Sequence, residues 1–129
     1  HEKSPLGAVA ALATIDVIET EGLLDRAAQL GLRTMQRLRD LPLPESLTAE
    51  VRGLGLALGL ALRQDGQPAV DSAQQILYGC LSRGLSFKVS DGNVLTLTPP
   101  LTITDDEMDD ALNILGEAIL SSCQRTLTP

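Results

Sequence analysis

A stretch near the middle of the chain, residues 51–63, constrains the fold most strongly. It reads VRGLGLALGLALR, and no charged side chain lies between Arg52 and Arg63. Such a segment is covered on both sides by other parts of the chain. Periodicity alone allows a buried helix. The three glycines each cost a helix about 1 kcal/mol, and they suit a strand whose backbone is approached closely on one face. We therefore predict a buried central strand.

The overall composition describes a small folded domain. The chain has 129 residues, of which 43% are hydrophobic and 21% charged, and this is enough for one domain with a single core. Its formal net charge of -7 disfavours nucleic acid, which needs a basic face, and an anionic membrane surface. No uncharged apolar run reaches the ~18 residues that a membrane span requires. We predict neither a nucleic-acid partner nor a membrane partner.

The chain ends and the cysteines indicate a cytoplasmic protein. The first residues contain neither an initiating methionine nor a signal-peptide pattern, so we expect a processed chain, an engineered chain or a fragment. Cys80 and Cys123 are far apart and do not form a C-x-x-C pair. Both fall at apolar positions of predicted helices. We therefore predict two buried, reduced thiols.

Few residues in the chain are suited to catalysis by themselves. His1 is the only histidine and is terminal, so no internal histidine can act as a general base or a zinc ligand. Five carboxylates cluster in residues 105–110, which could suggest a cation site. Thr104 and Glu107 have the spacing of a helix capping box, however, and capping explains the first three carboxylates without a metal. We predict no metal site.

Residues 1–40 are predicted to be helical in two pieces. Ser4 can cap the first helix and Pro5 suits its first turn, and the pattern restarts near Gly22. Residues 6–18 are apolar on most of the helix circumference, so we expect this helix to contact a second domain or subunit. The second piece has a one-sided apolar stripe, with arginines expected on its outer side.

The remaining residues predict a small α/β unit. Residues 41–50 are predicted to be a surface connection and residues 64–68 a turn, and a helix spans residues 70–81 before Gly84. Strands are expected at residues 85–89 and 94–97, joined by a hairpin at Asp91 and Gly92, with a last helix after Thr104. This order predicts an α+β fold, a two-layer sandwich of a mostly antiparallel sheet with helices on one face. We divide it into residues 1–40, which contact other domains, and a small domain of residues 41–129.

Four blocks resemble the C-terminal small domain of class III aminotransferases, which are pyridoxal-phosphate enzymes of fold type I. The blocks are SPLGAVAALATIDVIE (residues 4–19), LLDRAAQLG (residues 23–31), VRGLGLALG (residues 51–59) and GNVLTLTPPLTIT (residues 92–104). They occur in the family's order and cover nearly the whole chain. The resemblance implies a lid-like domain that partners the large cofactor-binding domain of the same protein in a homodimer.

The resemblance also implies that the cofactor is held elsewhere. In the family, the lysine that binds pyridoxal phosphate lies upstream of the first block, and the threonine that contacts its phosphate falls immediately before His1. Lys3 and Lys88, the only lysines here, do not match the family's lysine motif. We therefore expect no catalytic residue in this chain, cofactor contacts outside it, and no activity from these residues alone.

One position departs from the family pattern in a way that concerns the substrate. Family members that use amino acids carry an arginine in G-N-V-L-R-L that binds the α-carboxylate in a bidentate manner, and Thr96 stands there in this chain. This favours a small amine or amino-lactam substrate, or else a purely structural role for Thr96. Glu2 and Lys3 either line the substrate entrance or are simply solvated. Arg52 is expected to have a structural partner at the strand's edge.

Three functions follow as hypotheses. The first is a transaminase that transfers an amino group from an amine to a keto acid. The second is a racemase or epimerase for amino acids or amino-lactams, which needs no keto acceptor. The third, from another class, is a free-standing oligomerising or ligand-sensing module; the apolar helix at residues 6–18 disfavours it, because a free domain would expose a large apolar patch.

Overall fold

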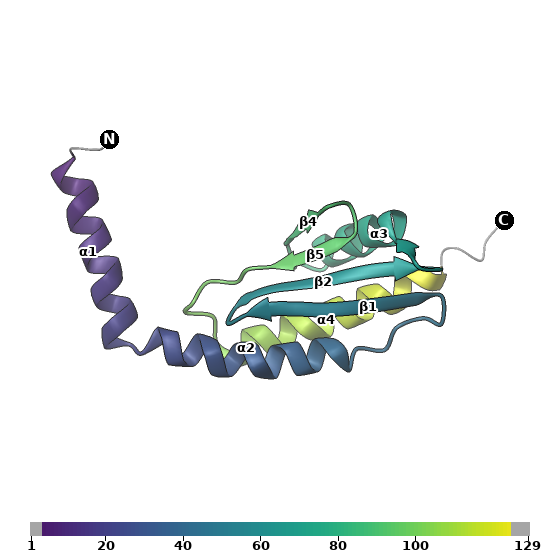
Figure 1. Cartoon of the computed structure of the whole chain (residues 1–129), viewed down its shortest axis with the longest axis horizontal. Helices are drawn as coiled ribbons and strands as arrows, with labels where there is room; N and C mark the ends of the chain where they lie inside the picture. Colours follow the sequence, from purple (N-terminus) through teal and green to yellow (C-terminus); the bar gives the residue numbers. More distant parts are fainter. Residues whose placement is uncertain (1–3, 125–129) are drawn as a thin grey trace.

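The computed structural model describes residues 4–124 and confirms the α+β fold class (Figure 1). The elements in chain order are α1 (Pro5–Thr20), α2 (Leu23–Arg39), β1 (Leu47–Leu54), β2 (Ala57–Gln64), β3 (Gln67–Pro68), α3 (Val70–Leu81), β4 (Lys88–Ser90), β5 (Val94–Leu97) and α4 (Asp105–Gln124). No helix among these residues has the length and apolar character needed to cross a membrane.

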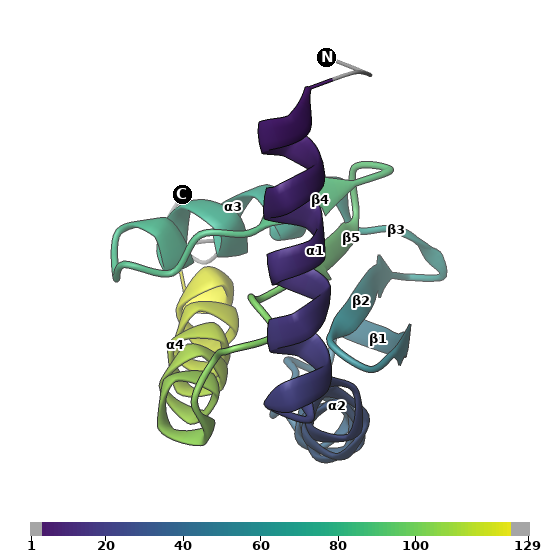
Figure 2. The same ribbon diagram turned by 90° about the vertical axis from the view of Figure 1, so that its left-hand side faces the viewer.

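The strands form one antiparallel sheet in the order β1-β2-β5-β4, with the short β3 paired to β2. Helices α2, α3 and α4 pack on one face of this sheet, and no helix of the described residues covers the other face (Figure 2). The core lies between the two layers. Its largest fully buried side chains come from β2, β5, α2, α3 and α4: Leu60, Leu62, Ile76, Leu95, Leu115, Ile119, Thr34 and Cys80.

The prediction of one central strand at residues 51–63 is wrong. The stretch is divided between β1 and β2, which form a hairpin that turns at Gly55 and Leu56. Gly55 adopts a φ of 54°, in the left-handed region that favours glycine. Strand β1 begins at Leu47, so residues 47–50 belong to the sheet and not to the predicted surface connection. Only the β2 half is mostly buried.

The expected close backbone approach occurs at the turn of this hairpin. A Cβ atom on Gly31 of α2 would overlap the carbonyl oxygen of Gly55. Helix α2 therefore lies directly against the β1-β2 turn, and this contact requires a glycine at position 31. This contact fixes the position of α2 on the sheet.

The predicted break between the first two helices is confirmed at Gly22, which has a φ of 61°. Ser4 occupies the N-cap position of α1 and Pro5 its first turn, but the Ser4 side chain makes no capping hydrogen bond. Helix α2 buries the predicted stripe. Helix α1 buries no residue, projects away from the sheet and contacts only α2 among the described elements (Figure 1).

The C-terminal half follows its local sequence signals closely. Helix α3 has the predicted bounds, and Gly84 follows it with a φ of 89°. Asp91 and Gly92 both have positive φ angles, 50° and 78°, as the predicted hairpin turn requires. Strand β5 is confirmed at residues 94–97. Strand β4 begins only at Lys88, so residues 85–87 are not part of the predicted strand.

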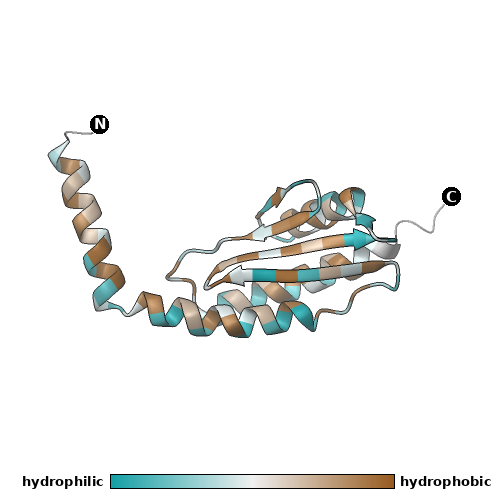
Figure 3. Ribbon diagram, in the orientation of Figure 1, coloured by the Kyte–Doolittle hydropathy of each residue, from teal (hydrophilic) through white to brown (hydrophobic). Residues whose placement is uncertain are grey.

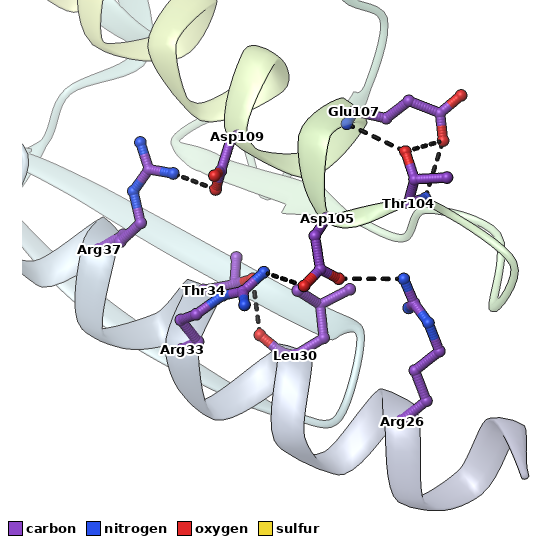
Figure 4. A network of polar contacts seen from close by, with 9 residues as sticks. All are labelled: Arg26, Leu30, Arg33, Thr34, Arg37, Thr104, Asp105, Glu107 and Asp109. Atoms are coloured by element: carbon purple, nitrogen blue, oxygen red, sulfur yellow. Dashed lines mark hydrogen bonds and ion pairs between the residues drawn. The ribbon is translucent and has the colours of Figure 1, made fainter.

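Ion pairs connect α2 to the start of α4 (Figure 4). Arg26 and Arg33 both bind Asp105, at 3.1 and 2.9 Å, and Arg37 binds Asp109. Arginines near the end of α2 were expected on its outer side. Two of them, Arg33 and Arg37, instead join α2 to α4 through these ion pairs. Asp105 and Asp109 therefore hold α4 against α2, and Asp105 also interacts favourably with the positive N-terminal end of α4.

The predicted capping box at the start of α4 is confirmed (Figure 4). The Glu107 amide donates to Thr104 Oγ1 at 3.2 Å, and the Thr104 amide donates to Glu107 Oε2 at 2.8 Å. The bond from the Thr104 amide, with a second from its hydroxyl, lowers the pKa of the Glu107 carboxyl. Within residues 4–124, no group of three histidine, cysteine, aspartate or glutamate side chains is arranged to hold a metal.

Candidate functional site

The uncovered face of the sheet is the candidate site, because Thr96 lies on it. Side chains alternate between the two faces of a strand. Leu95 of β5 is fully buried toward the helices and is paired with Val89 of β4. The adjacent residues Thr96 and Lys88 therefore lie on the opposite face, which we call the open face.

Four residues form one row across the open face. Thr96 is paired with Lys88 on one side and with Gly59 on the other, and Gly59 is paired with Arg52. Neighbouring strands lie about 4.8 Å apart, so the Lys88 backbone is about 5 Å from that of Thr96 and about 15 Å from that of Arg52. We call this set, Lys88, Thr96, Gly59 and Arg52, the cross-strand row.

The hydroxyl group of Thr96 is held in place. Its Oγ1 atom lies 2.9 Å from Oγ of Ser90, and either group can be the donor. Ser90 is part of β4, in the hairpin that Asp91 and Gly92 close, so the turn sets this contact. Thr96 therefore presents a fixed hydroxyl where the resembled family has an arginine.

The two cations of the cross-strand row are not neutralised. Within residues 4–124, neither Lys88 nor Arg52 forms an ion pair or a side-chain hydrogen bond, and both are exposed. The structural partner predicted for Arg52 is not found among the described residues, so that expectation stays a prediction. The next row along the open face contains one carboxylate, Glu50, which is also unpaired within the described part of the chain.

A cavity of about 370 Å³ lies beside the row, below the point where β4 begins. Residues 84–87 and 96–100 form one side of it, and α4 forms the other. The lining is mostly apolar and contains no charged side chain. This cavity can receive apolar groups, whereas charge recognition is confined to the open face.

The other predicted site residues are placed as follows. Glu2 and Lys3 lie outside the described residues. Ser90 and Lys88 were not predicted as neighbours of Thr96. A two-residue turn at Asp91 and Gly92 would pair residue 88 with residue 95. The observed turn spans residues 91–93, and the added residue pairs Lys88 with Thr96 instead.

The side chain of Cys80 is buried in the core and is not accessible to a substrate. It is a free thiol, and burial raises its pKa to about 11 against the opposing attraction of Arg83. Such a thiol stays protonated and unreactive at neutral pH. The burial of Cys80 is as predicted, whereas the side chain of Cys123 lies outside the described part of the chain.

Known proteins identify the family. The model of the class III aminotransferases matches residues 3–119. This chain belongs to that family. The match covers all four sequence blocks, and it makes the cross-strand row part of a class III small domain.

Several relatives show the range of chemistry within this family. The chain is 42% identical to the (R)-1-hydroxy-2-aminoethylphosphonate ammonia-lyase of Vibrio splendidus, covering 96% of this chain and 26% of that protein. It is 38% identical to the leucine/methionine racemase of Thermococcus litoralis, covering 90% and 27%. It is 37% identical to the ornithine aminotransferase of Bordetella pertussis, covering 92% and 27%. The chain thus spans about a quarter of the length of these relatives.

Solved structures agree with the fold. A transaminase from directed evolution by ancestral reconstruction superposes with a TM-score of 0.85 at 32% identity, covering 95% of this chain and 28% of that one. A phospholyase from Arthrobacter in complex with phosphoethanolamine superposes with a TM-score of 0.83 at 27% identity, covering 91% and 29%.

The described residues do not form a pyridoxal-phosphate site by themselves. Lys88, the one lysine among them, lies on an exposed strand of the open face rather than in an enclosed pocket. No step of the chemistry is therefore assigned to a residue of this chain acting on the cofactor. The open face carries hydroxyl and cationic side chains, which can bind an anionic group.

Proposed function

We propose that this chain is the small C-terminal domain of a larger pyridoxal-phosphate-dependent enzyme that acts on a small primary amine bearing a phosphonate or phosphate group. The observation that carries the proposal is Thr96, with its hydroxyl fixed by Ser90. A neutral hydroxyl cannot replace the bidentate, charged fork of an arginine. Recognition of a simple α-amino acid through this position is therefore disfavoured.

The substrate class is supported by two relatives. The ammonia-lyase that is 42% identical is named for an amino-phosphonate, and the phospholyase structure contains phosphoethanolamine. In both molecules a tetrahedral phosphorus group takes the place of a carboxylate as the anionic end. A small domain without the carboxylate-binding arginine is consistent with such substrates.

The favoured reaction is the transfer of the amino group to a keto acid, with ammonia elimination as the second candidate. When bound, pyridoxal phosphate supplies the electron sink for bond breaking at the amine carbon. Racemisation or epimerisation, supported by the racemase among the relatives, requires a stereocentre at that carbon. An aminoethyl phosphate or phosphonate has none there, so racemisation ranks third.

The remainder of the enzyme is proposed to cover α1. Leu6, Val9 and Leu12 are 79%, 63% and 67% exposed, and the helix shows apolar residues around its circumference (Figure 3). The large cofactor-binding domain or the second subunit of a homodimer would bury this surface. A free-standing module would leave it in water. The buried free thiol of Cys80 supports a reducing, cytoplasmic setting.

The test is a substrate assay on the full-length protein loaded with cofactor. Phosphoethanolamine, ethanolamine and L-alanine are each supplied with and without 2-oxoglutarate, and the aldehyde or keto product and ammonia are measured. We expect phosphoethanolamine to be preferred. Dependence on 2-oxoglutarate identifies transamination, and ammonia release without it identifies elimination. Use of L-alanine with a higher kcat/KM than phosphoethanolamine would contradict the proposal.

A further inference from the structure

We propose that Lys88, together with Arg52, binds the phosphonate or phosphate end of the substrate over Thr96 and Gly59. This inference rests on the proposed function and names the residues that would recognise its substrate. It places the anion-binding charge one strand away from the position where the family's amino-acid transaminases carry arginine.

The first support is the placement of Lys88. It is directly paired with Thr96, and both project from the open face because Val89 and Leu95 occupy the covered face. Directly paired side chains on one face of an antiparallel pair lie within contact distance of each other. The ammonium group of Lys88 can therefore reach a ligand that sits on the Thr96 hydroxyl.

The second support is the state of the charges. Arg26, Arg33 and Arg37 are paired with the carboxylates of α4, whereas Lys88 and Arg52 are unpaired within residues 4–124. A phosphate group carries a charge of about -1.5 to -2 at neutral pH, so two cations match it better than they match a single carboxylate. Glu50, the one carboxylate of the neighbouring row, lies two residues from Arg52 on the same face of β1 and at the opposite side of the sheet from Lys88.

The third support is the space between the cations. Gly59 has no side chain, and a Cβ atom there would meet only Val94 Cγ1 at 3.4 Å and the Arg52 carbonyl at 3.9 Å. The row therefore has a gap between Thr96 and Arg52, and Lys88 lies one strand beyond Thr96. A tetrahedral oxyanion can sit in this gap and accept from both sides.

The fourth support is a spare hydroxyl proton. Ser90 and Thr96 have one hydroxyl proton each, and the bond between them uses one. No other described group accepts the second proton. It is available to an oxygen of the anion, in addition to the ammonium and guanidinium donors.

The experiment compares substrates that differ only in the phosphate group. In the full-length holoenzyme, kcat/KM is measured for phosphoethanolamine and for ethanolamine, and their ratio is compared between wild type and variants. We expect Lys88→Gln to lower this ratio at least about tenfold, mainly through KM, since a charge-assisted bond is lost. Arg52→Gln should lower it less, about threefold, because Arg52 lies farther from Thr96. Lys88→Arg should restore most of it.

Arg39→Gln is the matched control, because Arg39 is an exposed arginine at the end of α2, away from the sheet. It should leave the ratio unchanged. Inhibition by inorganic phosphate gives a second measurement, and the inhibition constant should rise about tenfold in Lys88→Gln. Cofactor content and thermal unfolding are recorded for each variant, so that lost cofactor or lost structure is not mistaken for lost recognition.

The outcomes separate the two proposals. If wild type prefers phosphoethanolamine but neither Lys88→Gln nor Arg52→Gln changes the ratio or the phosphate inhibition, this inference is wrong and the proposed function stands. If wild type does not prefer phosphoethanolamine over ethanolamine, the proposed substrate class is wrong and this inference falls with it.

Discussion

The two faces of the sheet have opposite compositions although the same strands supply both. The covered face presents Leu58, Leu60, Leu62 and Leu95, which are at most 2% exposed, to α2, α3 and α4. The open face carries charged and hydroxyl side chains in the cross-strand row. Because side chains alternate along a strand, neighbouring residues serve different purposes. A substitution on the covered face should change the stability of the fold, and a substitution on the open face should change ligand binding.

The largest effect should come from the covered face. Leu60→Ala removes a side chain that is 0% exposed and leaves a cavity in a closely packed core. We expect a loss of about 2–5 kcal/mol in the free energy of unfolding, measured by chemical denaturation. The control is Thr48→Ala on the open face, which should change stability by less than about 0.5 kcal/mol. Equal losses would remove the distinction between the faces.

The contact between Gly31 of α2 and the β1-β2 turn should tolerate no larger side chain at position 31. Gly31→Ala places a Cβ against the Gly55 carbonyl oxygen, which is backbone and cannot rotate away. We expect a loss of about 1–3 kcal/mol in the free energy of unfolding. Gly7→Ala on exposed α1 meets only Ser4 Cβ at 4.0 Å and should instead stabilise by up to about 1 kcal/mol. A stable Gly31→Ala protein would show that α2 does not lie this close to the turn.

A substitution on the open face should change substrate specificity without changing the stability of the fold. Thr96→Arg restores the charged fork at the position where the family binds an α-carboxylate. In the full-length enzyme, the ratio of kcat/KM for L-alanine over phosphoethanolamine should rise about tenfold, equivalent to ~1.4 kcal/mol. Thr48→Arg, on the same face but outside the cross-strand row, is the matched control. An unchanged ratio would argue that position 96 does not face the substrate.

The smallest effect is expected at the first turn of α4, where the capping box is exposed to solvent. Thr104→Ala removes the capping box and should cost about 1 kcal/mol at neutral pH. Because the folded state lowers the pKa of Glu107 below its ordinary 4.5, this stabilisation is present above that pH and is lost as the pH falls through the lowered pKa. The stability difference between Thr104→Ala and wild type should therefore shrink in acid. A constant difference down to low pH would contradict it.

Much of the fold could be predicted because its signals are local. The break at Gly22, the hairpin at Asp91 and Gly92, and the capping box at Thr104 each depend on the geometry of a few adjacent residues. The β1-β2 hairpin was missed for the same reason. Gly55 and Leu56 lie inside a continuous apolar run, without the polar residues that usually mark a turn, so no local signal divided the run in two.

The candidate site could be predicted only at Thr96, and only through the family resemblance. Its neighbours Lys88, Gly59 and Arg52 lie on three other strands, separated by up to 44 positions along the chain, from residue 52 to residue 96. Strand order and register bring them together. Arg52 illustrates the limit, since no sequence signal placed it on the open face, where it has no partner among the described residues.

The sequence by itself determined the helices, the capping box at Thr104, the turn after β4 and the family, because each depends on neighbouring residues or on short sequence motifs. Only the tertiary structure decided which cations are neutralised and which are left free. Arg37 and Arg52 look alike in the sequence. The packing of α2 against α4 gives Arg37 a carboxylate partner, and the alternation of β1 turns Arg52 toward the uncovered side. Charge pairing is a property of distances in space, and a sequence does not contain these until the chain has folded.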